Sequence, residues 1–283
     1  MIVQISSFQN IILPVIILPV MPIQPAIPIA CISQQEYHEI DERIVGHSMA
    51  IHNQFGRLLD EIVYKNELAE RCFKDGMPAQ REVRIRVTHR DFVKDYFIDM
   101  LLCGSTIIEA KTAKETLEAH KGQGINYLLL AGTHHGSLVN FRLPSVKRYF
   151  LSTRLTHELR REFKTIEKGW PKDEDHIRLR DCVMELVRDI GLGLDLPLYR
   201  EAIAHITGCS RQLVPLKNGS SSLGHHEMLV LNEDVGIAIT ALPEQEEFRT
   251  HLSRLLQLTP LAGISWINLK LGEIRFEHLK RVK

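Results

Sequence analysis

Residues 96–111 read YFIDMLLCGSTIIEAK and carry the clearest structural signal in the sequence. Two short apolar runs flank a Gly-Ser turn, which is typical of a β-hairpin. Side chains alternate across a strand, so Glu109 and Lys111 share a face, and pairing within the hairpin can bring Asp99 beside them. Two carboxylates with one ammonium suit Mg²⁺, or Mn²⁺, and the activation of a water for attack on phosphorus. The alternative is a cross-strand salt bridge.

The segments around the hairpin complete an α/β pattern. Apolar residues recur at helical spacing in two segments before the hairpin and in one after it, whereas two further segments have the composition and alternation of strands. The order is helix, three strands, helix, strand. The expected helices span 36–55, 58–73 and 114–130, and the expected strands span 82–88, 96–102, 106–110 and 137–141.

The expected helices carry further polar candidates. Glu61 and Tyr64 lie one turn apart, as do Gln123 and Tyr127, and His120 lies one turn before Gln123. Glu61 is either a solvated charge or a second acidic group that points at the same metal. His120 is either a phosphate or helix-end contact or a packed surface histidine.

Four ordered blocks carry a resemblance to a known family. They are residues 55–68 (FGRLLDEIVYKNEL), residues 96–111, the spacing His120-x-x-Gln123-x-x-x-Tyr127, and residues 138–141 (LVNF). Over about residues 36–150 the chain resembles the GxxExxY proteins of the PD-(D/E)XK nuclease superfamily. It departs from the literal motif at Leu58, where the family's first signature glycine falls.

This resemblance implies a restriction-endonuclease-like αβββαβ core with a mixed sheet, and a metal-dependent nuclease activity. It implies that Asp99 and Glu109 bind Mg²⁺ or Mn²⁺ with support from Glu61, and that Lys111 handles the attacking water. Gln123 and Tyr127, a pair shared with RecB-type exonucleases, would orient the site or a phosphate.

The rest of the chain contains a weak internal repeat of the first part. At a shift of 135 residues Gly56, Leu59, Asp60 and Tyr64 fall on Gly191, Leu194, Asp195 and Tyr199. Glu227 then corresponds to Asp99, whereas Ala238 and Thr240 stand where Glu109 and Lys111 should be, and Arg254 and Leu258 replace the Gln/Tyr pair. Residues 176–283 are therefore interpreted as a tandem copy of the fold with a degenerate metal site. Chance similarity is the alternative.

Residues 1–32 are unusually apolar and rich in proline. Pro14, Pro19, Pro22, Pro25 and Pro28 would break any membrane-spanning helix, and no Lys or Arg precedes Arg43 to form the charged start of a secretory signal. We expect this segment to lie outside the fold, as an extension that precedes a start near Met21. The alternatives are an extended arm that packs on the domain and, less favoured by the prolines, a membrane role.

Residues 142–168 carry eight basic residues against three glutamates. A basic stretch beside a phosphodiesterase site suits a nucleic-acid backbone, but several of these charges also lie at helical spacings, as in a solvated helix. The candidate nucleic-acid contacts are Tyr64, His120, Arg142, Lys147 and Arg148.

The composition sets the remaining limits. The chain has 283 residues, equal numbers of acidic and basic residues and five scattered cysteines, which fit a cytoplasmic globular protein without a disulfide framework. The expected domains are 33–150 with an intact site, 151–175 as a basic linker or helix, and 176–283 as the degenerate copy. The expected function is a metal-dependent nuclease, on DNA rather than RNA, without membrane association and with a possible protein partner or homo-oligomer. The rival is a non-catalytic nucleic-acid-binding or complex-forming protein.

Overall fold

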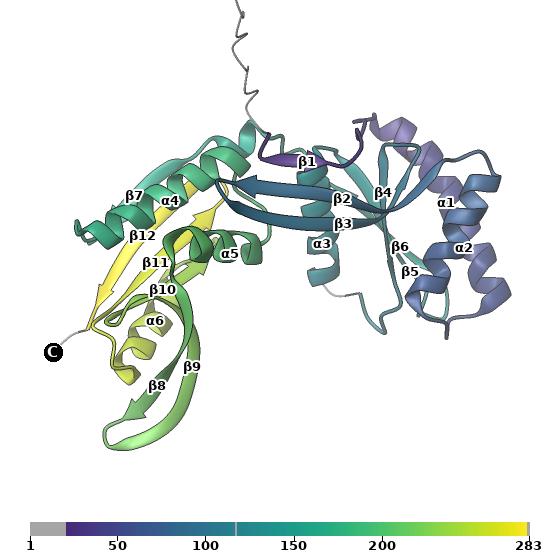
Figure 1. The fold of residues 1–283 in the computed structure, drawn as a ribbon. Coiled ribbons are helices and arrows are strands. Elements are labelled where there is room, and N and C mark those ends of the chain that lie inside the picture. The colour runs from purple at the N-terminus through teal and green to yellow at the C-terminus, as the bar shows by residue number, and fades with distance from the viewer. Residues whose placement is uncertain (1–20, 117, 282–283) are drawn as a thin grey trace, which may run out of the picture.

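The computed structural model describes residues 21–116 and 118–281, which form two mixed sheets with helices packed on them (Figure 1). We call residues 21–152 the first unit and residues 164–280 the second unit. The first unit contains β1 (Ile23–Pro25), α1 (Gln34–Phe55), α2 (Glu61–Lys74), β2 (Ala79–His89), β3 (Phe92–Leu102), β4 (Thr106–Lys111), α3 (Glu118–Ala131), β5 (His135–Asn140) and β6 (Lys147–Ser152).

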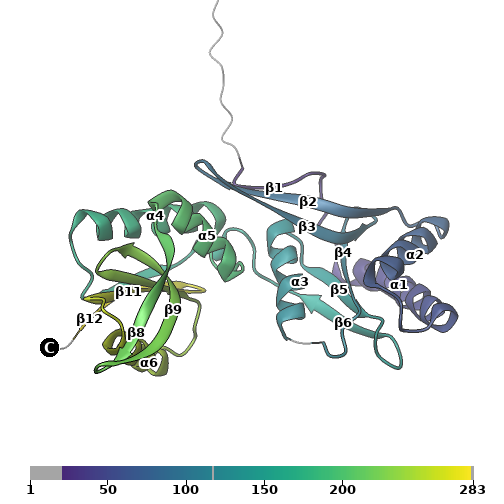
Figure 2. The same cartoon turned by 60° about the horizontal axis from the view of Figure 1, so that its bottom comes forward.

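The first sheet has the order β1-β2-β3-β4-β5-β6, and only β4 and β5 run parallel. Helices α1 and α2 cover one face and α3 covers the other (Figure 2). The amphipathic pattern of α1 begins at a capping box, in which the side chains of Ser33 and Glu36 each accept a hydrogen bond from the other residue's backbone N–H. The predicted α/β class and the mixed sheet are therefore confirmed, with β1 and β6 as additional strands.

The expectation that residues 1–32 lie outside the fold is wrong for residues 21–32; residues 1–20 lie outside the described residues. Ile23 is buried, and β1 pairs antiparallel with β2. The chain continues along the first unit, where the Ala30 N–H donates to the carbonyl of Gly104. Proline, which has no N–H to donate, is tolerated in such an edge strand because half of the strand's backbone groups point away from the sheet. The extended arm, which was the alternative, is thus the arrangement observed for this part.

The second unit contains β7 (Lys164–Lys168), α4 (Glu174–Ile190), α5 (Leu196–Thr207), β8 (Ser210–Asn218), β9 (Ser221–Asn232), β10 (Val235–Thr240), α6 (Glu246–Leu258), β11 (Gly263–Lys270) and β12 (Glu273–Lys280). Its sheet has the order β7-β12-β11-β10-β9-β8. Strands β10 and β11 run parallel, as β4 and β5 do. From β8 to β12 the strands pair as β2 to β6 pair, and the three helices occur at the same points in the order.

The segment between the units is not a basic helix. It contains a single 3₁₀ turn, η1 (Leu159–Arg161), followed by the edge strand β7. Arg160 is buried and donates to the carbonyls of Leu129, Ile190 and Leu192 at 3.1, 2.6 and 2.7 Å. The Arg160 guanidinium therefore links the two units by donating to carbonyl groups that would otherwise lack donors. The spacing of charges along the sequence does not reveal this buried role.

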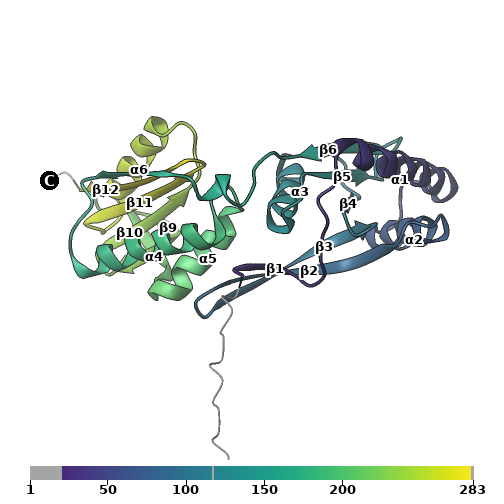
Figure 3. The same cartoon turned by 90° about the horizontal axis from the view of Figure 1, so that it is seen from above.

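The far ends of β2 and β3 extend beyond their own sheet and reach α4 and α5 (Figures 1 and 3). Tyr96 donates to Asp195 at 2.7 Å, and Lys94 forms an ion pair with Glu201 at 2.8 Å. One hydrophobic cluster runs through this contact and includes Ile85, Leu129 and Leu198 from the two units. The units thus share a core. Among the described residues no helix is long and apolar enough to cross a membrane.

Candidate active site

Asp99 is held beside β4 at the point where two strands separate. Strands β3 and β4 pair only from Met100 to Leu102, so the ladder stops one residue short of Asp99. At this point the Asp99 side chain replaces a backbone carbonyl of β3 as the acceptor for β4, because its Oδ2 accepts the Ala110 N–H at 3.1 Å. This bond fixes Asp99 next to Glu109, as the hairpin predicted.

Glu109 is wholly buried, and only part of its carboxylate is satisfied. Its Oε2 lies 3.4 Å from the Lys111 Nζ, whereas its Oε1 has no hydrogen-bond partner within the described part of the chain. Burial and the charge of Asp99 raise the pKa of Glu109, and Lys111 opposes that shift only in part. An unpartnered oxygen beside a second carboxylate is a costly arrangement that a bound cation would relieve.

A divalent cation fits this pair. Mg²⁺ commonly takes one or two carboxylates and completes its shell with water and substrate phosphate, so Asp99 and Glu109 suffice as protein ligands. Both Asp99 oxygens already accept a hydrogen bond, but each keeps a second lone pair for a metal. Within residues 21–116 and 118–281 there is no group of three or more His, Cys, Asp or Glu side chains placed to hold a metal.

Glu61 does not join Asp99 and Glu109 in the predicted set of metal ligands. It begins α2, and its Oε2 accepts the Thr112 N–H at 3.2 Å, just beyond the end of β4. The structure therefore brings Glu61 near the hairpin but does not place it in a ligand cluster with Asp99 and Glu109. Its role as observed is to tie α2 to the segment that follows Lys111.

Lys65 is a site residue that the sequence analysis missed. It lies one turn after Glu61 on α2, and its Nζ is 3.0 Å from Asp99 Oδ1 and 3.3 Å from Glu82 Oε1. Although burial opposes the shift, Asp99 and Glu82 raise the pKa of Lys65. The i,i+4 spacing from Glu61 was the available signal, but the direction of the side chain depends on how α2 packs on the sheet.

Backbone strain lies directly opposite Asp99. Glu82 has a φ of 51°, and it lies opposite Asp99 at a break in the ladder, where no pair forms between Arg81↔Met100 and Val83↔Ile98 although the register is unchanged. A left-handed conformation is uncommon for a residue other than glycine, and such strain is concentrated at functional sites. A cavity of about 540 Å³ opens beside this break and is lined by Ile62, Lys65, Ala79, Arg81, Glu82 and Asp99.

The predicted pair of Gln123 and Tyr127 lies near Asp99 and Glu109. Gln123 donates to the Tyr127 hydroxyl at 3.2 Å, and burial, with smaller effects from Glu109 and Asp99, raises the pKa of Tyr127. Helix α3 approaches β4 closely at Gly124, where a Cβ would lie 3.8 Å from the Glu109 Cγ. The tighter contact of α3 at this point is with Leu151 of β6, whose Cδ1 would lie 2.3 Å from an added Cβ.

Two of the predicted nucleic-acid contacts are structural. Tyr64 is wholly buried, donates to the Gly56 carbonyl at 2.7 Å and stacks on Phe141. Arg148 forms an ion pair with Asp41 on the face of the sheet that α1 covers, opposite the face that carries Glu109. Neither is placed to contact a nucleic acid at the Asp99/Glu109 site, because tertiary packing determined which way these side chains point.

The other basic candidates remain accessible. Arg142 lines a cavity of about 310 Å³ together with Arg57 and Lys114, so three cations from separate segments meet there. Lys147 is exposed at the start of β6, and His120 is half-buried in the first turn of α3.

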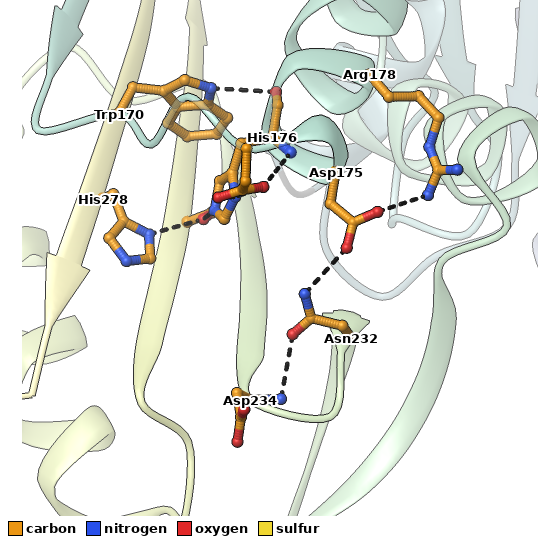
Figure 4. Close-up of polar contacts among 9 residues, drawn as sticks. Trp170, Asp175, His176, Arg178, Asn232, Asp234 and His278 are labelled. Atoms are coloured by element: carbon orange, nitrogen blue, oxygen red, sulfur yellow. Dashed lines mark hydrogen bonds and ion pairs between the residues drawn. The ribbon is translucent and has the colours of Figure 1, made fainter.

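In the second unit an aspartate, a histidine and a serine are connected in the order of a hydrolase triad, but the serine is not accessible to a substrate. The network lies around His176 and His278 (Figure 4). The His176 Nδ1 lies 2.8 Å from Asp173, and its Nε2 lies 2.9 Å from the Ser265 hydroxyl, which also contacts His278. Ser265 has no exposed surface, so no substrate can reach its oxygen. The network instead fastens α4 to β11 and β12.

The match to known proteins agrees with this geometry. Residues 38–150 match the family model of the PD-(D/E)XK nuclease superfamily. The match spans less than half of the chain and covers the sheet and helices that hold Asp99, Glu109 and Lys111. It suggests nuclease activity and a nucleic-acid substrate, and nucleases of this superfamily generally use divalent metal ions. No curated protein and no solved structure gives a significant match to the chain.

Proposed function

We propose that the first unit is a metal-dependent nuclease that hydrolyses phosphodiester bonds, with DNA as the favoured substrate. The observation that carries the proposal is the buried Glu109, whose Oε1 lacks a partner while Asp99 lies beside it and Lys111 contacts its other oxygen. The superfamily match over the same residues supports it independently.

Asp99 and Glu109 would hold Mg²⁺ or Mn²⁺. When bound, such an ion polarises a phosphoryl oxygen and makes a water easier to deprotonate. Lys111 is on the face of β4 that carries Glu109, where its ammonium can orient that water or stabilise the charge that develops on the phosphate. Gln123 and Tyr127 provide an amide and a hydroxyl on the helix above the site, which suits the positioning of a phosphate.

The nucleic-acid backbone would lie along the cations at the edge of the site. Arg57, Lys114 and Arg142 form one cluster, and Lys147 and His120 are further contacts on the same unit. Each phosphate that these residues neutralise would release counterions, so binding should weaken as salt is raised.

The second unit would be a tandem copy of the fold that has lost its metal site. The matching order of helices and strands supports this proposal, as does the matching pairing from β8 to β12. Ala238 and Thr240 stand on the strand that corresponds to β4 and offer neither a carboxylate nor an ammonium. A copy without catalytic residues is suited to binding rather than cleavage.

The test is incubation of the purified protein with linear, circular and single-stranded DNA and with RNA, in Mg²⁺, Mn²⁺ or EDTA. We expect metal-dependent cleavage that falls at least about a hundredfold in Lys111→Ala and Asp99→Ala. Lys121→Ala, on a half-buried lysine of α3 that pairs with Glu118, is the matched control and should cleave as the wild type does. Equal cleavage by all four proteins would indicate a contaminant and end the proposal.

One observation favours the rival function, a nucleic-acid-binding protein without catalysis. The Lys65 ammonium contacts the Asp99 carboxylate that a metal would need. If Lys65 replaces the metal, the protein should bind nucleic acid in a salt-sensitive way, cleave none, and show no rise in thermal unfolding temperature with Mg²⁺ or Mn²⁺.

A further inference from the structure

The second unit contains a cavity at the place where the first unit has its carboxylates. It has a volume of about 510 Å³ and lies between β9, β10, α5 and α6. Strands β9 and β10 correspond in order and pairing to β3 and β4, and Glu227, Ala238 and Thr240 line the cavity from them. Ala238 is much smaller than Glu109, so space is left open between the strands and the helix.

The helix side of the cavity differs from the sequence prediction. Arg254 and Leu258 were expected to replace Gln123 and Tyr127, but neither of them lines the cavity. The residues of α6 that do are Phe248, His251, Leu252 and Leu255. His251 and Leu255 have the same spacing as Gln123 and Tyr127 and lie three residues before Arg254 and Leu258, so the predicted register of this helix is wrong by three residues.

The floor of the cavity is apolar. Phe248 is half-buried and offers an aromatic ring at its wall. The buried floor residues are Met228, Leu229, Ile237, Ile239 and Leu252. Such a floor favours a flat apolar group and has no ligand for a metal ion.

The rim of the cavity carries positive charge. Arg200 is held in place by a 2.7 Å bond to the Ile239 carbonyl, and Arg211 reaches the rim from β8. His226 and His251 are exposed beside them. The single carboxylate, Glu227, lies 3.5 Å from Arg211 and offsets only one of the two guanidinium charges.

We propose that this cavity binds one unpaired nucleotide of a single-stranded nucleic acid, with the base on the apolar floor and the phosphate at Arg200 and Arg211. The inference rests on the proposed function for the class of ligand. An unpaired nucleotide combines a flat apolar base with an anionic phosphate, which matches a floor without charge under a cationic rim. A base within a duplex is stacked and paired, and therefore cannot enter such a cavity.

The experiment measures binding in EDTA, so that cleavage does not interfere. Fluorescence anisotropy is followed with three labelled probes of equal length, namely a single-stranded DNA, the same strand with abasic sites, and a blunt duplex. We expect the base-bearing single strand to bind at least about fivefold more tightly than the abasic strand. Ala238→Phe, which fills the cavity, should abolish that preference, and Arg211→Ala should weaken binding of both single strands by a similar factor.

Arg254→Ala is the matched control, because Arg254 is an exposed arginine of α6 that does not line the cavity. It should change no affinity by more than about twofold. Because Ala238→Phe could disturb folding, its thermal unfolding temperature is compared with the wild type. His251→Ala, at an exposed position, is a second cavity variant that should also reduce the preference for bases.

The two proposals can fail separately. Equal affinity for base-bearing and abasic strands, or an unchanged preference in Ala238→Phe, would overturn the cavity proposal even if Mg²⁺-dependent cleavage is found. A preference for base-bearing strands that Ala238→Phe removes, with an overall affinity that Arg211→Ala lowers and without any cleavage by the wild type, would support the cavity and overturn the nuclease. Photocrosslinking of a strand that carries 5-iodouracil should label the peptide containing Phe248, and labelling confined to the first unit would contradict the proposal.

Discussion

Tyr64 and Tyr199 make the same two hydrogen bonds in the two units. The Tyr64 hydroxyl donates to the Gly56 carbonyl at 2.7 Å and accepts the Leu59 N–H at 3.2 Å. The Tyr199 hydroxyl donates to the Gly191 carbonyl at 2.6 Å and accepts the Leu194 N–H at 3.2 Å. In each unit a buried tyrosine thus closes the turn between two helices.

Because both tyrosines bond the equivalent carbonyl and N–H, Tyr64→Phe and Tyr199→Phe should both destabilise the protein, Tyr199→Phe more strongly. Gly191 and Leu194 are buried, so losing their partner costs about 1–3 kcal/mol, whereas Gly56 and Leu59 are exposed and water can replace the lost hydroxyl in part. Chemical denaturation followed by circular dichroism would measure the loss. A loss in Tyr199→Phe with none in Tyr64→Phe would contradict the equivalence of the two turns.

Gly124→Ala should destabilise the protein by about 1–3 kcal/mol, because the new methyl group would lie 2.3 Å from Leu151 Cδ1 on β6 and force α3 or the Leu151 side chain to move. Gly122 lies on the same helix with nothing within 4 Å of an added Cβ. Gly122→Ala should therefore raise stability by up to about 1 kcal/mol through helix propensity. Thermal unfolding of both variants makes the comparison, and equal behaviour would show that α3 does not pack tightly on Leu151 of β6 at Gly124.

Glu109→Gln should make the metal-free protein more stable at neutral pH. The folded protein holds the pKa of Glu109 above its unfolded value, so stability is lost as pH rises from that value toward the folded one. Glutamine avoids the buried charge, and we expect a gain on the order of 2 kcal/mol in EDTA.

The same variant gives a metal test. If Glu109 is a ligand, Mg²⁺ or Mn²⁺ should raise the unfolding temperature of the wild type but not of Glu109→Gln. A destabilised Glu109→Gln in EDTA would mean that the carboxylate has a favourable partner in the apo protein.

Stability should also fall with acidity through His278. Burial, with the nearby charges of His176 and Lys280, lowers the pKa of His278 to about 4. An unfolded histidine titrates near ~6.5, so the unfolded state binds more protons between these two values. The free energy of unfolding should therefore decrease as pH falls from about 6.5 to about 4.

His278→Phe introduces the residue type that Phe150 supplies at the corresponding strand position, where it faces Ser137 as His278 faces Ser265. This variant should show a weaker dependence of unfolding free energy on pH over that range. Denaturation series at several pH values provide the measurement. An unchanged slope would assign the acid sensitivity to other groups.

Local patterns in the sequence were sufficient to predict several helices and strands of the first unit. Alternation fixed Glu109 and Lys111 on one face of β4, helical spacing fixed Gln123 and Tyr127 on one face of α3, and the α/β class followed from these periods. Such patterns are readable because the interacting residues are neighbours along the chain.

The tertiary structure decided which faces meet, and with them the partners of each charge. It placed Lys65 on Asp99, buried Tyr64 and Arg160, and paired β1 with β2. Each of these contacts joins residues that are far apart in the sequence, and their free energy depends on burial and on partners that no local period encodes.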